Sequence, residues 1–321
     1  MGSAHVGFAD GREAVVGIRA EVERTALVVT GTDQEDGDAE MGGTDEAGSK
    51  SGHAHGKASW ISLSLTLPGL RDDDQGLIFL EEMLSEVLAA PAAQIAANTT
   101  TTAMTVSGSG SLQDALVINS RWHWRLHIDV VLISPPEGSA AGSYPLPLLS
   151  MAIHLALRDT RVPRLKSEGE EDPLADDDWE ASAHLYGKPG KGRGRSLAAG
   201  VPAVTLLVMV VGENVVFDPT GTELAVADGV FAVGIGRASG EGNGDGVSVL
   251  AVRMLETNAR DTFKGVARHE GGNEWEVVPG VWRPKVGGVK RAVLAKVMKA
   301  VLGDVGKEVI GSLEAFIVQG G

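Results

Sequence analysis

The order in which hydrophobic patterns follow one another along the chain sets the strongest limit on its fold. Residues 2–29 alternate apolar with small or polar side chains on both sides of Asp10-Gly11, which is typical of a β-hairpin. A strand pattern at 60–67 and a helix pattern at 77–90 come next, and strands followed by a helix recur in the second half. This order predicts an α+β protein of two packed halves and argues against a parallel, doubly wound sheet.

Five further elements are recognisable from their periodicity. Residues 121–134 alternate like a long strand, and residues 146–160 are apolar nearly all round, as in a buried helix. In the second half, 200–220 is expected to be a hairpin that turns at Gly212-Glu213-Asn214, and residues 229–255 are expected to form another. The segment 287–316 has the pattern of a long amphipathic helix or a helix pair.

Composition suggests where the halves begin and end. We expect a first half at 1–165, a charged linker at 166–195 and a second half at 196–321. Within the first half, residues 32–57 have almost no large apolar side chain and many Gly, Asp and Glu residues. A segment of this kind cannot bury enough surface to fold, so it is expected to be a disordered acidic insertion.

The net charge of −15 is concentrated in two segments. Seven acidic residues and no basic residue lie in 33–46, and another seven acidic residues without a base lie in 168–178. Of the 43 acidic residues in the chain, 29 remain outside these segments, against 28 bases. The net charge therefore does not exclude RNA as a partner, because local basic faces matter more than the total.

Several classes of protein are excluded by what the sequence lacks. Cysteine is absent, which rules out disulfides, thiolate catalysis and cysteine-ligated zinc. No apolar run approaches the roughly 18 residues needed to span a membrane. The first residues also lack the basic-then-apolar pattern of a signal peptide. We therefore expect a soluble, intracellular protein with no membrane partner.

Three stretches carry a resemblance to a known family. They are "GSAHVGFADGREAVVGIRAEV" at 2–22, "WHWRLHIDVVLIS…LLSMAIHLALRDTRVPRL" within 122–165, and "VVFDPTGTEL…ADGVFAVGI" within 215–235. In this order and spacing they resemble the RNase PH-like ring subunits of the RNA exosome, and most closely the non-catalytic members. Such relatives usually carry some tens of residues before the first hairpin, including an Arg-x-Asp-Gly-Arg segment. This sequence starts at Met1-Gly2-Ser3, and we expect a truncated gene model.

The resemblance implies a fold, an assembly and a role. The implied fold is RNase PH-like, with two halves that each consist of strands backed by helices. The implied partners are other RNase PH-like subunits in a six-membered ring, RNA-binding cap subunits, and RNA that is threaded to a nuclease subunit. The implied role is 3′–5′ processing and degradation of RNA, including maturation of ribosomal RNA, in the nucleus and nucleolus and also in the cytoplasm.

Active members of the family, as the resemblance implies, need two sites. Inorganic phosphate attacks the last phosphodiester, and an anion cradle at a helix N-terminus, typically Gly-Gly-Thr-Arg-Thr, holds it through backbone N–H groups, a hydroxyl and an arginine. An acid cluster near Asp-Leu-Asp-Tyr-x-Glu-Asp binds Mg²⁺ or acts as a general acid.

In this chain both sites are altered. The helix at the cradle position opens with "GSYPLPLLS", in which Pro145 and Pro147 have no N–H and no arginine is present. In the second site Thr220 replaces the middle aspartate and Pro219 stiffens the turn. We therefore expect no catalytic residue, no metal and no cofactor. The acidic residues that remain are interpreted as a vestigial acid site, namely Asp218, Glu223 and Asp228.

Structural roles are expected for the remaining carboxylates. Asp218 can cap its turn through its side chain, Glu223 is expected to face solvent, and Asp228 belongs to an ordinary Asp-Gly turn. Asp129 lies inside an apolar strand, where a carboxylate needs a partner. For Asp129 we expect a salt bridge to a neighbouring arginine rather than catalysis.

Two groups of basic residues are candidates for the RNA path. The first group surrounds "RDTRVPR" and the second lies in "KPGKGRGR". Contact with a neighbouring subunit, for the first group, and a solvated loop, for the second, are the alternatives. No aromatic residue is interleaved with these bases, so no stacking platform is indicated. The candidates are Arg158, Arg161, Arg164, Lys188, Lys191, Arg193 and Arg195.

Three functions remain open at the level of the sequence. The first is a non-catalytic structural and RNA-path subunit of a multi-subunit exoribonuclease. The second is an active phosphate-dependent 3′–5′ exoribonuclease with a diverged cradle. The third is a free-standing RNA-binding protein on the same fold.

Overall fold

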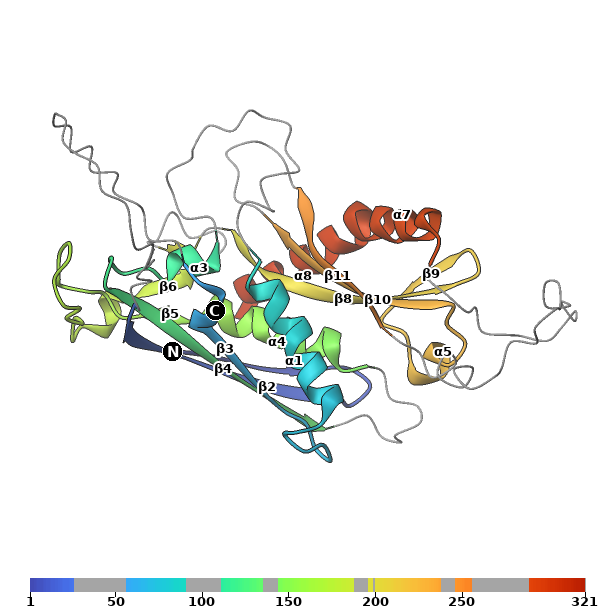
Figure 1. The fold of residues 1–321 in the computed structure, drawn as a ribbon, viewed down its shortest axis with the longest axis horizontal. Coiled ribbons are helices and arrows are strands. Elements are labelled where there is room, and N and C mark those ends of the chain that lie inside the picture. The colour runs from blue at the N-terminus through green and yellow to red at the C-terminus, as the bar shows by residue number, and fades with distance from the viewer. Residues whose placement is uncertain are drawn as a thin grey trace, which may run out of the picture.

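The structure, a computed structural model, describes most of the chain. The described residues are 1–25, 56–90, 111–134, 144–187, 196–198, 200–237, 246–255 and 289–320. The insertion expected at 32–57 therefore lies outside them except for Gly56 and Lys57, and so do Lys188, Lys191, Arg193 and Arg195. Figure 1 shows that the described elements stack in four layers, in which sheets alternate with helices.

The first sheet contains the predicted hairpin at its edge. Its strands lie in the order β1-β2-β4-β3. The hairpin turns through Gly11, whose φ of +85° is a left-handed conformation that glycine adopts at no steric cost. β1, β2 and β4 are antiparallel, whereas β3 runs parallel to β4. The strands are β1 Gly2–Gly7, β2 Glu13–Arg24, β3 Ile61–Thr66 and β4 Trp122–Ser134.

The described elements cover one face of this sheet and leave the other face open. Along β4 the alternation predicted from the sequence is confirmed, since Leu126, Ile128 and Val130 are buried on the inner face. The residues between them are less buried, and Asp129 is exposed on the outer face. An antiparallel sheet with one solvated face has this apolar-in, polar-out pattern.

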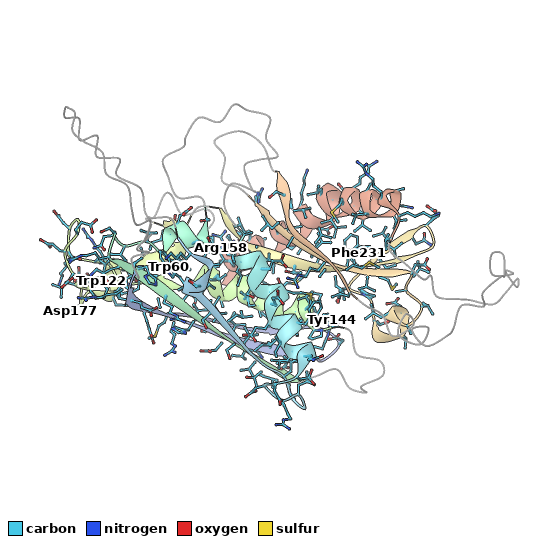
Figure 2. The ribbon with its side chains drawn as sticks, in the orientation of Figure 1. Trp60, Trp122, Tyr144, Arg158, Asp177 and Phe231 are labelled. Atoms are coloured by element: carbon cyan, nitrogen blue, oxygen red, sulfur yellow. The ribbon has the colours of Figure 1, made fainter. Side chains whose placement is uncertain are left out.

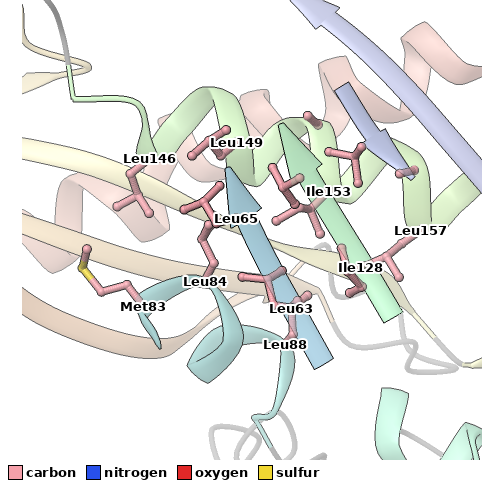
Figure 3. Close-up of a cluster of buried hydrophobic side chains, with 14 of the residues drawn as sticks. Leu63, Leu65, Met83, Leu84, Leu88, Ile128, Leu146, Leu149, Ile153 and Leu157 are labelled. Carbon is pink, nitrogen blue, oxygen red and sulfur yellow. The ribbon is translucent and has the colours of Figure 1, made fainter. Parts of the chain in front are cut away.

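Helices α1 Gln75–Leu88 and α4 Leu146–Asp159 form the layer between the two large sheets. The α1 helix begins at Asp74, whose carboxylate accepts a hydrogen bond from the Gly76 amide and caps the first turn. The predicted apolar face of α1 is buried, and α4 is buried nearly all round, as its sequence indicated. Figure 3 shows side chains of β3, α1, β4 and α4 meeting in one cluster, among them Leu65, Leu84, Ile128 and Ile153.

The second sheet lies on the other side of α1 and α4. Both predicted hairpins are present, and all neighbouring strands are antiparallel in the order β11-β10-β8-β9. Leu207 and Met209 of β8 belong to the core shared with the first half, whereas Val208 and Val210 face the opposite side. The strands are β8 Val201–Val211, β9 Asn214–Phe217, β10 Gly229–Arg237 and β11 Val247–Leu255.

The C-terminal layer covers the far face of the second sheet. It consists of α7 Arg291–Ala300 and α8 Gly306–Gly320, joined by a π-helical turn at Val301–Val305. Gly303 in this turn has ψ of −106°, which is outside the helical range and kinks the segment. The sequence left a single helix or a helix pair open, and the structure has the pair.

The segment expected as a linker, 166–195, contains more structure than its charge suggested. β6 lies within it and pairs with β5 and β7 in a small third sheet. The acidic run 168–178 packs on the turn before β4, where Trp122 Nε1 donates to Asp172 Oδ1 at 3.0 Å. Figure 2 shows Trp122 and Asp177 together at the left-hand end of the molecule. The small strands are β5 Arg161–Val162, β6 Ala183–Tyr186 and β7 Ser196–Ala198.

Four short helices complete the described residues, and their length hides them from periodicity analysis. They are η1 Ala58–Trp60, α3 Leu112–Ala115, η2 Trp179–Ala181 and α5 Gly221–Leu224. The α+β class and the two large sheets with their helices are confirmed, whereas the boundaries 1–165 and 196–321 stay predictions. None of the helices described is long and apolar enough to cross a membrane.

Candidate functional site

The three acids of the expected vestigial site lie around the turn from β9 to β10. Asp218 follows β9 directly, Glu223 lies in the short helix α5, and Asp228 immediately precedes β10. Asp218 is the one non-glycine residue with positive φ among those described, at +47°. Its amide donates to the Leu207 carbonyl at 3.0 Å, so the backbone here is fixed to β8.

The side chain of Asp218 points across the molecule to the first hairpin. Its Oδ2 lies 3.3 Å from Nη2 of Arg12, whose own side chain is only 2% exposed. The sequence led us to expect that this carboxylate caps its own turn. That expectation was wrong, because an opposite charge from a residue 206 positions away is within reach.

Arg12 is the residue of this site that sequence reasoning missed. Its Nε donates to Asp10 Oδ2 at 2.5 Å and its Nη1 donates to the Tyr144 carbonyl at 3.4 Å. The guanidinium carbon also lies 5.0 Å from the centre of the Phe8 ring. The signal available in the sequence was a base directly after the Asp10-Gly11 turn, but nothing in it revealed the partner across the molecule.

Asp10, one of the two carboxylates beside Arg12, is held in its ionised form. Partial burial pushes the pKa of Asp10 upward, but hydrogen bonds from the Arg12 amide and side chain outweigh it, so this pKa is lowered overall. The guanidinium thus has carboxylates on two sides, Asp10 and Asp218. Arg12 contacts the Tyr144 carbonyl at the start of α4, and its charge is already compensated by Asp10 and Asp218.

Glu223 has a local structural role. It forms a capping box with Thr220, in which each side chain accepts a hydrogen bond from the other residue's amide. These bonds from the Thr220 amide and hydroxyl lower the pKa of the Glu223 carboxyl. Glu223 is exposed, as expected, and Thr220 at the position of the missing aspartate serves as the N-cap of α5.

Asp228 stabilises the neighbouring hairpin. Its Oδ2 accepts a hydrogen bond from the Gly212 amide at 2.7 Å, and Gly212 turns with φ of +57°. Asp218, Glu223 and Asp228 therefore each have a partner of their own. Among the described residues no group of three or more His, Asp or Glu side chains is arranged to hold a metal ion.

The start of α4 occupies the position of the expected anion cradle. Pro145 is the N-cap and makes no side-chain capping bond, and Pro147 lies in the first turn. Neither residue has an N–H to offer an anion, so two donors of an ordinary helix start are missing. Burial raises the pKa of the adjacent Tyr144 hydroxyl to about 12, which leaves it neutral. Residues 142 and 143 of the cradle sequence lie outside the described residues.

Arg158, the first candidate for the RNA path, is buried. Its side chain is 4% exposed, its Nε donates to Glu314 Oε1 at 2.7 Å, and its Nη1 donates to the Gly187 carbonyl. The prediction that Arg158 contacts RNA was therefore wrong, because α8 closes over it. Figure 2 shows Arg158 in the interior of the molecule.

Next to this pair lies a buried histidine. His154 is fully buried, and its Nδ1 lies 2.9 Å from the Pro202 carbonyl. Its Nε2 is 3.4 Å from Glu314 Oε1. Burial and the charge of Arg158 nevertheless lower the pKa of His154 to about 3, so the imidazole is neutral and this contact is not an ion pair.

The other two arginines of the first group are accessible. Arg161 is half-buried on β5, and Arg164 is exposed beside a surface pocket that Trp124 and Leu197 also line. Neither has an ion-pair partner among the described residues. They stay candidates, together with the second basic group, whose residues lie outside the described part of the chain.

Asp129 differs from its expectation. It is exposed on the outer face of the first sheet, opposite Gly17 and Ser64, and is in no ion pair within the part of the chain that the structure describes. The predicted salt bridge was wrong, because a carboxylate on a solvated sheet face needs no partner.

The chain is similar to several known proteins. No protein-family model matches the chain. Two solved structures align with it at 15% identity: the archaeal exosome core, with a TM-score of 0.39, and the Archaeoglobus fulgidus exosome with RNA bound to the active site, with a TM-score of 0.42. Each alignment covers 84% of this chain. It covers 72% of the matched chain in the archaeal exosome core and 74% of the matched chain in the Archaeoglobus fulgidus exosome.

The relatives found by sequence are named components of one complex. Exosome complex component rrp42 of Schizosaccharomyces pombe is 28% identical over 255 residues, which are 74% of this chain and 64% of that protein. Exosome complex component RRP42 of Saccharomyces cerevisiae is 27% identical over 179 residues, which are 54% of this chain and 53% of that protein. The chain thus spans less than two thirds of the length of both. By sequence it is homologous to the exosome complex components of the rrp42 type.

Proposed function

We propose that this chain is a non-catalytic subunit of an exosome ring that supports 3′–5′ processing and degradation of RNA. Homology to the two yeast components supports the assembly. The proposed partners are RNase PH-like subunits that complete a six-membered ring, RNA-binding cap subunits, and RNA on its way to a nuclease subunit. The proposed location follows the complex: nucleus and nucleolus, and also cytoplasm.

The contact between Arg12 and Asp218 carries the proposal that the subunit is not an enzyme. A catalytic carboxylate must be free to bind a metal ion or to transfer a proton to the reacting atoms. Asp218 instead neutralises a buried guanidinium at 3.3 Å, and Glu223 and Asp228 are bound to backbone amides. All three carboxylates are thus committed to holding the fold.

The start of α4 supports the same conclusion. Phosphate in a helix-terminal cradle needs backbone donors and a countercharge. Pro145 and Pro147 supply no donor, and the positive charge of Arg12 faces Asp10 and Asp218. An incoming phosphate would have to displace a carboxylate of the same sign of charge.

An affinity pull-down tests the assembly. The tagged chain, expressed in its host, should co-purify with several RNase PH-like subunits and with a nuclease, as identified by mass spectrometry. Recovery of the chain alone, with RNA but without such subunits, would favour a free-standing RNA-binding protein and contradict the proposal.

A phosphorolysis assay tests the absence of catalysis. The purified chain, incubated with single-stranded RNA, phosphate and Mg²⁺, should release no nucleoside diphosphates. The control is the double variant Asp218→Asn, Asp228→Asn, which should give the same background. Phosphate-dependent release that disappears in this variant would identify an active exoribonuclease instead.

A further inference from the structure

Helix α7 and its N-cap residue have a charge unlike the rest of the chain. Lys290, Arg291, Lys296 and Lys299 lie within ten positions, and no acidic residue occurs from 284 to 303. The whole chain has 43 acidic and 28 basic residues, so an acid-free basic helix departs from the composition around it.

One side of α7 is anchored to the second sheet. Val297 and Val301 are fully buried in the core that covers the far face of this sheet. Lys296 is fixed at the side of the helix, since its Nζ donates to the Glu213 carbonyl and lies 3.2 Å from Glu213 Oε2. The helix is therefore held in a defined orientation on the surface, at the upper right of Figure 1.

The opposite side of α7 is open. Arg291, Ala292, Ala295 and Lys299 are exposed, and so is Lys290 at the N-cap. Arg291 and Lys299 are eight residues apart, which places them about 12 Å apart along the axis at about 1.5 Å per residue. We call Lys290, Arg291 and Lys299 the α7 basic face.

These three charges have no partner in the part of the chain that the structure describes. By contrast, Arg253 on β11 is bound by Glu82 and Glu86, and Lys296 is bound by Glu213. Lys290 and Arg291 also lie at the positive end of the helix dipole, where cations are disfavoured. The fold therefore keeps three cations together, two of them where an isolated helix would favour acids, and the described residues supply no counterion to them.

We propose that the α7 basic face binds the phosphate backbone of RNA. The side chains between the bases are Ala292 and Ala295, which are small enough for a polymer backbone to lie against the helix. A protein partner would need an apolar anchor or pocket at the centre of the contact. The basic residues and the two alanines of the open side provide no such anchor, and the leucines of this segment, Leu294 and Leu302, are only 36% and 37% exposed.

The character of this binding follows from the residues. Without aromatic side chains there is no stacking on bases, so binding should not depend on RNA sequence. Contact between cations and phosphates releases counterions, so affinity should fall steeply with salt. The inference rests on the proposed role in RNA metabolism, but it concerns this chain alone and not its place in a ring.

The test is a titration of the full chain against a fluorescein-labelled oligouridine over a series of salt concentrations, followed by anisotropy. The variant Lys290→Gln, Arg291→Gln, Lys299→Gln removes the α7 basic face. Loss of three phosphate contacts should lower the slope of log affinity against log salt by about 2 and the affinity at low salt by at least about tenfold. The matched control is Arg19→Gln, Lys57→Gln, Arg71→Gln, which removes three exposed positive charges elsewhere and should stay within about twofold of the wild type.

Three results would overturn the inference. One is a wild-type chain that does not bind the oligouridine. Another is an equal loss in both triple variants, which would mean that only the net charge matters. The third is binding of polyglutamate in preference to RNA through the same three residues, which would indicate an acidic protein partner. Co-purification of ring subunits is independent of all three, so the failure of this inference and that of the proposed function can be told apart.

Discussion

Arg12 shows how the fold compensates the cost of burying one charged side chain. Burying a guanidinium costs several kcal/mol of hydration, which is offset only if carboxylates and acceptors surround it. Here Asp10, Asp218 and the Tyr144 carbonyl surround it, from the first hairpin, the β9–β10 turn and the start of α4. A residue at the tip of one hairpin thus connects three parts of the chain.

Replacing Arg12 by methionine should therefore be costly. Removal of one member of a buried ion pair lowers the free energy of unfolding by about 3–5 kcal/mol. Asp10 and Asp218 are about 40% exposed, so water can solvate them when Arg12 is removed. We therefore expect a smaller loss of about 2–3 kcal/mol. Urea denaturation measures this free energy of unfolding. The same substitution at Arg19, an exposed residue paired with Glu21, is the control and should cost less than about 1 kcal/mol. Equal losses of stability at both positions would show that the ion pairs of Arg12 do not stabilise the fold.

His154 should make stability depend on pH. Its pKa is lowered from 6.5 to about 3 in the folded protein, so between these values the unfolded chain binds a proton that the folded chain does not. Stability is therefore complete above pH 6.5 and declines as the pH falls toward 3, by up to about 1.4 kcal/mol per pH unit.

Urea denaturation at pH 7 and pH 5 tests this. His154→Gln, which cannot titrate, should lose less stability between the two values than the wild type, by about 2 kcal/mol. His5→Gln, at an exposed histidine of the first hairpin, should behave like the wild type. If His154→Gln retains the full pH dependence, the histidine is not held neutral.

At the scale of elements, the packing of α1 on the second sheet depends on a missing side chain. Gly234 on β10 faces Val87 of α1, and a Cβ built at this glycine would lie 2.5 Å from a methyl carbon of Val87. Valine is β-branched and has little rotamer freedom in a helix, so it cannot move aside. The distance between helix and sheet is set by this pair.

Gly234→Ala should therefore destabilise the protein by about 1–3 kcal/mol, as overpacking does. Thermal or urea denaturation detects it, and the additional change Val87→Ala should recover part of the loss by making room. Gly17→Ala is the control, because a Cβ at Gly17 meets nothing within 4 Å on the open face of β2. A destabilisation by Gly234→Ala that Val87→Ala leaves untouched would argue against this packing.

Sequence periodicity predicted the long elements and missed the short ones. Strands of nine or more residues such as β4 and β8 carry enough alternation to be recognised, whereas β5 to β7, with two to four residues, do not. The candidate acids were located, but their partners were not. Asp218 and Arg12 are 206 residues apart, and no local pattern relates residues at such a separation.

At the scale of the molecule, the two halves share one interior. The α1 and α4 helices belong to the first half but pack between both sheets, so Leu207 and Met209 of β8 lie in the same cluster as Leu84. Arg158 and Glu314 join α4 to α8, and Arg12 and Asp218 join the first hairpin to the β9–β10 turn. Separation of the halves would expose apolar surface and break both ion pairs.

Unfolding should consequently be a single transition. In scanning calorimetry we expect one peak whose calorimetric and van't Hoff enthalpies agree. A fragment of residues 1–165 should lack a cooperative transition, because one side of α1 and α4 would face water. Two resolved peaks, or a cooperative melt of the fragment, would show that the halves are independent.

The ion pair between Arg158 and Glu314 also has a consequence for biosynthesis. Glu314 follows Arg158 by 156 residues, so at about 5–20 residues per second a ribosome needs roughly 8–30 s to supply the counterion. During this interval α4 is part of a nascent chain in which Glu314 has not yet been synthesised. Arg158 therefore cannot be buried together with its carboxylate partner. Nascent chains arrested before α8 should therefore be cleaved by protease within α4, and those released after α8 should be protected. Folding of the first half is then tied to α8, which leaves the ribosome exit tunnel long after α4.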